Sequence, residues 1–168
     1  GKHAFRSCTA LESIALPPKI AALDDDVFHG CSNLRSVALP DGLTLINNFV
    51  FSGCTRLQSV AIPSGVTAIG HSAFEGCSGL ASVSIPDGVT AVAPLAFCSC
   101  SGLTSVTFPR HGLTTIGRLA FAACRGLTDV TIPEGVTTID DSAFANCIGL
   151  KSITIPCGVT KIGENAFA

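Results

Sequence analysis

The chain has 168 residues, of which 47% are hydrophobic and only 13% are charged, about half the usual charged share. Ten basic and twelve acidic residues are scattered along it, and the net charge is −2 at pH 7. This composition excludes the basic patch that binding of nucleic acid or of an anionic membrane surface requires. Polar residues interrupt every apolar run after a few positions, which excludes a membrane-spanning helix.

An internal repeat of 23 residues runs through the whole sequence. Phenylalanine marks one position of it and cysteine another, three residues later: Phe5, Phe28, Phe51, Phe74, Phe97, Phe121, Phe144 and Phe167, with Cys8, Cys31, Cys54, Cys77, Cys100, Cys124 and Cys147. One step is 24 residues long, because Pro109-Arg110-His111-Gly112 has one residue more than Pro86-Asp87-Gly88. A fixed period of this length is typical of a solenoid, in which each repeat packs only against its neighbours.

Each repeat begins with a short predicted strand. Leucine follows the cysteine by three residues, and then a β-branched residue and a large apolar residue alternate with polar ones, as in Leu80, Val83 and Ile85. This alternation predicts a strand with one buried face. Proline ends the strand, and Ile-Pro-Asp-Gly fits a type I turn. Stacked repeats are expected to pair these strands into a continuous parallel sheet.

The second half of each repeat is predicted to contain a short extended segment and then one helical turn. The extended segment carries an apolar pair such as Val89 and Val92. We expect Ser72, and Ser142 at the equivalent position, to cap the N-terminus of the helical turn. The side chains of Ala73, Phe74 and Cys77 are expected on its inward face.

The consensus L-x-x-V-x-I-P-x-x-V-x-x-I-x-x-x-A-F-x-x-C resembles the BspA-like leucine-rich repeat family, and the match extends from Ala4 to Phe167. The resemblance implies an α/β repeat fold: a right-handed leucine-rich-repeat solenoid with a parallel β-sheet on the concave side and short helical turns and extended segments opposite. It also implies an extracellular or cell-surface setting and a role in adhesion and protein binding. It implies neither catalytic residues nor a cofactor.

Residues 1–168 are expected to form a single uncapped solenoid of about seven 23-residue repeats. The sequence begins and stops inside a repeat, contains no methionine and has no capping repeat. Uncapped ends expose core side chains. We therefore expect a segment of a longer array, with neighbouring repeats or other subunits packed at both ends.

The nine cysteines do not form an obvious disulfide pattern. Seven lie in one column of the repeat, where we expect them to be buried as small hydrophobic residues. Their Cβ vectors would run parallel in stacked repeats, which disfavours disulfides. Cys98 and Cys157 lie at other positions and are expected to be more exposed. Metal binding by thiols is not expected because no C-x-x-C motif occurs.

No catalytic or metal-binding constellation recurs. The four histidines, His3, His29, His71 and His111, have no Ser, Cys or carboxylate partner at a recurring spacing. The runs 24–26 and 140–141 of aspartates are expected to precede helical turns and to interact with their dipoles. A calcium site is the alternative for these aspartates, but the D-x-D-x-D-G spacing is missing.

The outward positions of the predicted strands are the first candidate contact surface. They are small and nearly uncharged, and the candidate contact residues among them are Ser82, Ser105, Thr107, Asp129 and Thr131. Such a face would let a partner approach closely. The alternative is that small residues merely suit a crowded array of parallel strands.

A second candidate is the column two residues before each phenylalanine, which is polar in most repeats. Phe49, Leu95 and Leu119 are the apolar exceptions, and Pro94 adjoins Leu95. Ile148 is a similar exception in a column of Ser, Thr and Arg. Large apolar side chains in otherwise polar columns predict a contact patch, and the alternative is that they are the scattered apolar residues common on protein surfaces.

The sequence therefore predicts a non-enzymatic module of a larger leucine-rich-repeat protein that binds another protein. The alternative is a structural scaffold subunit packed permanently in a larger assembly. Neither nucleic-acid binding nor membrane insertion is expected. An enzyme is the least favoured class, because no chemically active side chains recur or converge.

Overall fold

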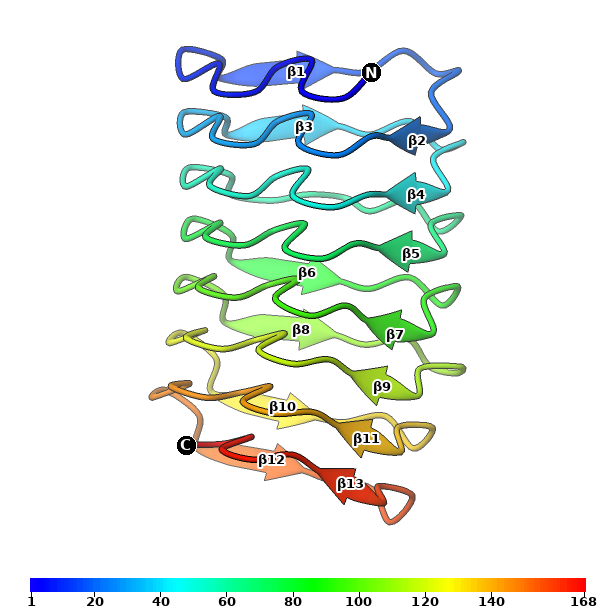
Figure 1. Cartoon of the computed structure of the whole chain (residues 1–168), viewed down its shortest axis with the longest axis vertical. Helices are drawn as coiled ribbons and strands as arrows, with labels where there is room; N and C mark the ends of the chain where they lie inside the picture. The colour runs from blue at the N-terminus through cyan, green and yellow to red at the C-terminus, as the bar shows by residue number, and fades with distance from the viewer.

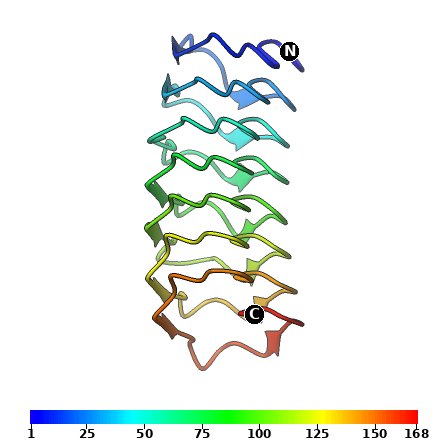
Figure 2. The same cartoon turned by 90° about the vertical axis from the view of Figure 1, so that its left-hand side faces the viewer.

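The computed structural model describes all residues from 1 to 168, and it is a stack of similar coils, each one repeat long. The two ends of the chain lie at opposite ends of the stack (Figure 1). Seen from the side, the coils form a nearly straight column (Figure 2). The predicted solenoid is confirmed.

A short strand with one buried face opens every coil except the one that contains residues 59–61. The three-residue strands are β1 (Ser13–Ala15), β3 (Ser36–Ala38), β6 (Ser82–Ser84), β8 (Ser105–Thr107), β10 (Asp129–Thr131) and β12 (Ser152–Thr154). All pairings are parallel, as between Val83 of β6 and Val106 of β8. The central β-branched residue points inward and its neighbours point outward, so the alternation in sequence predicted the faces correctly.

A second set of two-residue strands forms another side of the coil. It comprises β2 (Ala22–Leu23), β4 (Leu45–Ile46), β5 (Ala68–Ile69), β7 (Ala91–Val92), β9 (Thr115–Ile116), β11 (Thr138–Ile139) and β13 (Lys161–Ile162). They form parallel ladders in the orders β2-β4-β5 and β13-β11-β9-β7. These strands correspond to the predicted extended segments.

The predicted helical turns are absent, because the segment around each phenylalanine contains residues in the left-handed region. Two columns, two residues before and two after the phenylalanine, have φ between 53° and 74°: His3, Asp26, Phe49, Ser72, Leu95, Leu119, Ser142 and Asn165, and Ser7, Gly30, Gly53, Gly76, Ser99, Ala123 and Asn146. A right-handed helix cannot include such residues. Instead, the N–H of each phenylalanine in this column from Phe5 to Phe144 donates to a carbonyl of the following coil, at 2.7–2.9 Å.

The predicted N-caps are therefore wrong as well. Ser72 and Ser142 have φ of 53° and 55°, whereas an N-cap residue has β-region angles. The Ser72 hydroxyl is buried without a hydrogen-bond partner. The aspartates do not face helix dipoles either: one carboxylate oxygen of Asp25 accepts the N–H of Asn48 in the next coil, at 3.1 Å, and Asp141 accepts the N–H of Glu164 at 3.0 Å.

The phenylalanines form a continuous stack along the interior, from Phe5 to Phe167. Consecutive ring centroids lie 5.1–5.7 Å apart and the ring planes are within 17° of parallel. The rings from Phe28 to Phe121 are completely buried. This offset stacking adds to the free energy gained from burying each ring.

The cysteine column packs beside this stack and is hydrogen-bonded to it. Each thiol from Cys31 to Cys147 donates to the carbonyl oxygen of the phenylalanine one coil earlier, at 3.0–3.2 Å. Burial raises the pKa of the Cys54 and Cys100 thiols to about 12. All nine cysteines are free. Cys8 is exposed, contrary to expectation, because no earlier coil covers it.

The expected continuous sheet is interrupted in two places. The three-residue strands pair only as β1-β3, β6-β8 and β10-β12. Residues 59–61 occupy the equivalent position in their coil but form no strand, and β8 and β10 are not paired across the 24-residue step. The structure also has no helical stretch with the length and hydropathy that crossing a bilayer requires.

Candidate protein-binding surface

The first candidate surface, which we call the strand face, consists of the outward side chains of the three-residue strands. All five residues predicted from sequence are exposed on it: Ser82, Ser105, Thr107, Asp129 and Thr131. The face therefore presents hydroxyl groups and short side chains, without the large side chains that would keep a partner at a distance.

Asp129 is the one charged residue of this predicted set. Hydrogen bonds from the hydroxyls of Ser152 and Thr128 lower the pKa of its carboxyl group. Because the ordinary pKa of this group is already acidic, Asp129 carries a negative charge at neutral pH. Asp129 is therefore the only residue of the predicted contact set that offers a charge for an ion pair with a partner.

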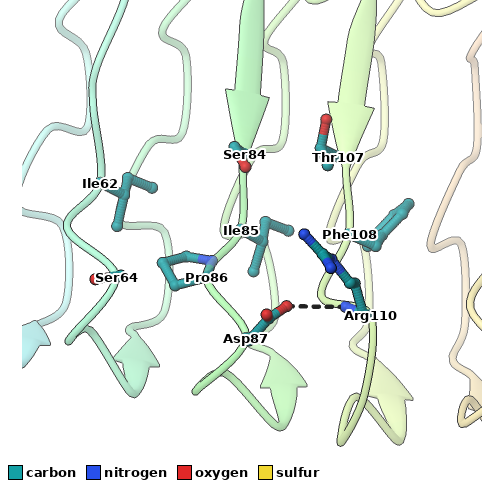
Figure 3. Close-up of a pocket in the computed structure, with 9 residues that line it drawn as sticks. All are labelled: Ile62, Ser64, Ser84, Ile85, Pro86, Asp87, Thr107, Phe108 and Arg110. Carbon is teal, nitrogen blue, oxygen red and sulfur yellow. Dashed lines mark hydrogen bonds between the residues drawn. The ribbon is translucent and has the colours of Figure 1, made fainter.

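A groove of about 280 Å³ adjoins the strand face where the strands end in their proline turns (Figure 3). We call it the proline-turn groove, and it is lined by Ile62, Ser64, Ser84, Ile85, Pro86, Asp87, Thr107, Phe108 and Arg110. Ser84 and Thr107 belong to both surfaces, so the groove continues the strand face. The structure thus brings one predicted residue, Thr107, into a concave site.

The groove has an apolar floor and a polar rim. Ile85 is almost fully buried, and the half-buried ring of Phe108 packs edge-on against the buried ring of Phe121, with centroids 5.7 Å apart. On the rim, the carboxylate of Asp87 accepts the backbone N–H of Arg110 at 2.9 Å. An apolar floor with a few polar groups around it is the usual composition of a binding site.

Sequence reasoning missed this groove, although two features mark it. Phe108 is the only aromatic residue in a column that otherwise contains Leu or Ile. The single 24-residue step lies directly after it, and the longer turn carries Arg110 on the rim. A larger side chain and an inserted residue together change the shape of one turn.

The second predicted patch lies on the turn layer, which comprises the left-handed bends on either side of each stacked phenylalanine. Pro94 is exposed, but Phe49, Leu95 and Leu119 are half-buried. The ring of Phe49 makes an edge contact with His71, with centroids 5.2 Å apart. The side chains of this column were expected to point into solvent. Instead, these residues form left-handed bends of the turn layer, and their side chains pack partly against that layer.

Ile148 lies apart from those four residues, in the tight turn after the last cysteine of the column. It is 77% exposed, the largest exposed fraction among the large hydrophobic side chains. The sequence therefore predicted its outward orientation correctly. Its role in contacts stays a prediction.

Four titratable side chains cluster at one place that the sequence did not indicate. The Asp26 carboxylate lies 3.6–3.7 Å from nitrogens of His3, Arg6 and His29. These are ion-pair distances rather than hydrogen bonds. Nowhere in the chain do three or more His, Cys, Asp or Glu side chains gather in a way that could hold a metal ion.

The comparisons with known proteins agree with this architecture. The family model described as BspA type Leucine rich repeat region (6 copies) matches residues 1–125 and 46–168. A leucine-rich repeat protein from Bacteroides ovatus has a similar structure, with 31% identity and a TM-score of 0.93 over 97% of this chain and 42% of that one. No curated protein sequence matches.

Two further solved structures are similar. A leucine-rich repeat protein from Eubacterium ventriosum has 30% identity and a TM-score of 0.85, and the match covers 92% of this chain and 42% of that one. A leucine rich cell surface protein from Faecalibacterium prausnitzii has 29% identity and a TM-score of 0.63, covering 99% and 59%. The chain thus spans less than half the length of the first two proteins. From the family match and the repeated coil, the chain belongs to the BspA-type leucine-rich repeat family.

Proposed function

We propose that the chain is a non-enzymatic protein-binding module of a larger leucine-rich-repeat protein, used in adhesion at a cell surface. The observation that carries the proposal is the continuity of the exposed strand face with the proline-turn groove. The strand face admits the partner's backbone, and the groove takes an apolar side chain. The cell-surface setting is supported by the likeness to the Faecalibacterium prausnitzii protein.

The composition of the surface indicates a moderate affinity. The chain contains no Trp or Tyr, and these residues are prominent among the side chains that dominate tight interfaces. The half-buried side chains of Phe108 and Ile62 are then the main apolar contacts in the groove. Binding of this kind gains strength when many repeats engage together, as in a longer array.

Photo-crosslinking tests the proposal at the level of surfaces. A benzoylphenylalanine residue placed at Thr107 samples the strand face and the groove, and one at Pro94 samples the turn layer. After irradiation with surface proteins from host or neighbouring cells, we expect protein adducts from Thr107 and not from Pro94. The substitution Ser105→Arg in the same protein should abolish these adducts, because a long charged side chain blocks close approach.

The alternative outcomes are distinct. Adducts that form only at Pro94 would indicate that the partner binds the turn layer and not the strand face. Adducts at Thr107 that persist in the Ser105→Arg variant would show that contact there is nonspecific. An absence of adducts at both sites would remove the protein-binding proposal.

A scaffold role is the second candidate, and one observation favours it. Ile148 is 77% exposed, in a column that otherwise contains Ser, Thr and Arg. An exposed large apolar side chain at a polar position favours permanent contact with another subunit. Sedimentation of the chain decides between the two: a monomer over a wide concentration range contradicts the scaffold role, and stable oligomers that Ile148→Ser disrupts would support it.

A further inference from the structure

A polar cavity lies at the other end of the strand positions, where the chain enters them from the cysteine column. Its volume is about 410 Å³, and it is lined by Arg35, Thr55, Arg56, Gln58 and Gly79. None of these residues is hydrophobic. The cavity is therefore unlike the proline-turn groove, which has an apolar floor.

The cavity exists because the next coil has small residues beside two large ones. The column of Arg56 continues with Gly79, and the column of Gln58 continues with Ala81. A Cβ atom added to Gly79 would lie 2.9 Å from the carbonyl oxygen of Thr55, so even alanine does not fit there without a shift. Because Gly79 has no side chain, no side chain from its own column covers Arg56.

The two arginines are held on adjacent coils and have no acidic partner. The backbone N–H of Gln58 donates to the carbonyl oxygen of Arg35, at 3.2 Å, which fixes their coils side by side. Arg6 and Lys161 lie within ion-pair distance of carboxylates, but neither Arg35 nor Arg56 does. Glu12 occupies the position of Arg35 one coil earlier and makes no ion pair with it.

We propose that this cavity binds a carboxylate of an acidic segment in the protein partner, an inference that rests on the proposed function. Two guanidinium groups offer forked N–H donors that match the two oxygens of a carboxylate. The amide of Gln58 adds a further donor, and no acidic side chain lines the cavity to compete. Gln58 directly precedes the exposed Ser59, so a segment that lies along the strand face reaches the cavity.

Charge complementarity is what selects this occupant. The chain as a whole has a net charge of −2, so it repels acidic segments at long range. Two unpaired positive charges in one concave site reverse that preference locally. An acidic segment is then expected to bind at this cavity.

Fluorescence anisotropy with a labelled hexaglutamate peptide tests the proposal, with hexaglutamine as the neutral probe. We expect the wild-type chain to bind hexaglutamate and not hexaglutamine, more weakly as salt is raised. The double variant Arg35→Gln/Arg56→Gln should bind hexaglutamate about tenfold more weakly. Arg125→Gln, which removes an exposed arginine elsewhere, is the control and should bind as the wild type does.

Three results would overturn the proposal. One is equal binding by the double variant and the wild type, and another is an equal loss in Arg125→Gln, which would indicate a general charge effect. The third is displacement of hexaglutamate by inorganic sulfate or phosphate at lower concentration than by acetate, which would assign the site to a different anion. Circular dichroism of the double variant, whose changes lie on exposed side chains, checks that it is folded.

Failure of this proposal can be distinguished from failure of the proposed function. If the cavity does not bind hexaglutamate but Thr107 adducts form, the strand face binds partners without this subsite. If hexaglutamate binds but no adducts form at Thr107, the cavity stands as an anion site and the protein-binding module does not.

Discussion

The two sides of each coil behave differently along the stack. The interior layer of phenylalanines and cysteines, which we call the Phe–Cys layer, repeats without interruption from Phe5 to Phe167. The three-residue strands, in contrast, form three separate pairs, with breaks at residues 59–61 and between β8 and β10. The coils are therefore held in register by the Phe–Cys layer rather than by pairing of the three-residue strands.

The 24-residue step shows this most clearly. Across it, Phe97 and Phe121 stack with centroids 5.3 Å apart and planes within 6°, which is within the range of the 23-residue steps. The backbone N–H of Phe97 still donates to the next coil, at 2.9 Å. On the strand side, the same step leaves β8 and β10 unpaired. The inserted residue is absorbed at the proline turn, where the groove is.

The distribution of backbone hydrogen bonds indicates why residues on the strand face can vary. Of 90 backbone–backbone hydrogen bonds, only 10 lie within the strands. Most backbone N–H and C=O groups are hydrogen-bonded within turns or between coils outside the strands. Substitutions on the strand face are therefore expected to lower the free energy of unfolding only slightly.

The largest expected change in stability occurs at alkaline pH and depends on the buried thiols of the Phe–Cys layer. Burial raises the pKa of Cys54 and Cys100 to about 12 and that of Cys147 to about 11, from an ordinary value of 9.0. The folded state therefore binds protons that the unfolded state releases, so the stabilisation is complete below pH 9 and is lost as the pH rises toward 12. Each such thiol lowers the free energy of unfolding by about 1.4 kcal/mol per pH unit in that window. Circular dichroism during a pH titration should show cooperative unfolding there.

The variant Cys100→Ala controls the alkaline prediction. It removes one buried thiol, so its stability should fall less steeply between pH 9 and 12. Identical pH dependence in the variant and the wild type would mean that the thiols do not carry the effect.

A cavity in the Phe–Cys layer should have the next largest effect. Phe121 is completely buried, stacks on Phe97 and Phe144, and contacts Phe108 edge-on. Phe121→Ala is expected to lower the free energy of unfolding by about 3–5 kcal/mol. Urea denaturation measures this change, and a loss below about 1 kcal/mol would contradict the dominant role of the layer.

Deleting the exposed His111 should have a small effect on stability. The deletion joins Pro109-Arg110 to Gly112 and restores the Pro-x-Gly spacing of the other coils. Because the Phe–Cys layer is already regular at this step, we expect a change within about 1 kcal/mol in urea denaturation. A loss as large as that of Phe121→Ala would mean that the longer turn supports the stack.

The strand face should tolerate substitution best. Ser82 is exposed, so Ser82→Ala is expected to change the free energy of unfolding by less than about 0.5 kcal/mol. Thermal unfolding of the two proteins side by side measures the difference. Equal losses from Ser82→Ala and Phe121→Ala would reverse the assignment of inside and outside.

Most of the inside and outside positions could be predicted from sequence, because a repeated apolar position must face the neighbouring coils. Phe74 and Cys77 are buried and Ser82 is exposed, as the columns indicated. The outward orientation of Ile148 followed from the same reasoning. Positions that recur seven times leave little ambiguity about their side of the coil.

The backbone of the turn layer could not be predicted in this way. Ser72 and Ser142 precede an apolar residue as N-caps do, but hydrogen bonds between coils favour left-handed angles at these positions. The proline-turn groove and the Arg35–Arg56 cavity were missed for a related reason. Each depends on residues from successive coils that lie beside each other only after stacking, such as Arg56 and Gly79.

Native-state hydrogen exchange tests the central claim most directly, since it compares the two sides of the coil in one experiment. We predict that the backbone N–H groups of Phe51, Phe74 and Phe97 exchange only through global unfolding, whereas those of residues 59–61 exchange through local opening and therefore faster. Slower exchange at residues 59–61 than in the phenylalanine column would contradict the claim that the Phe–Cys layer holds the coils together.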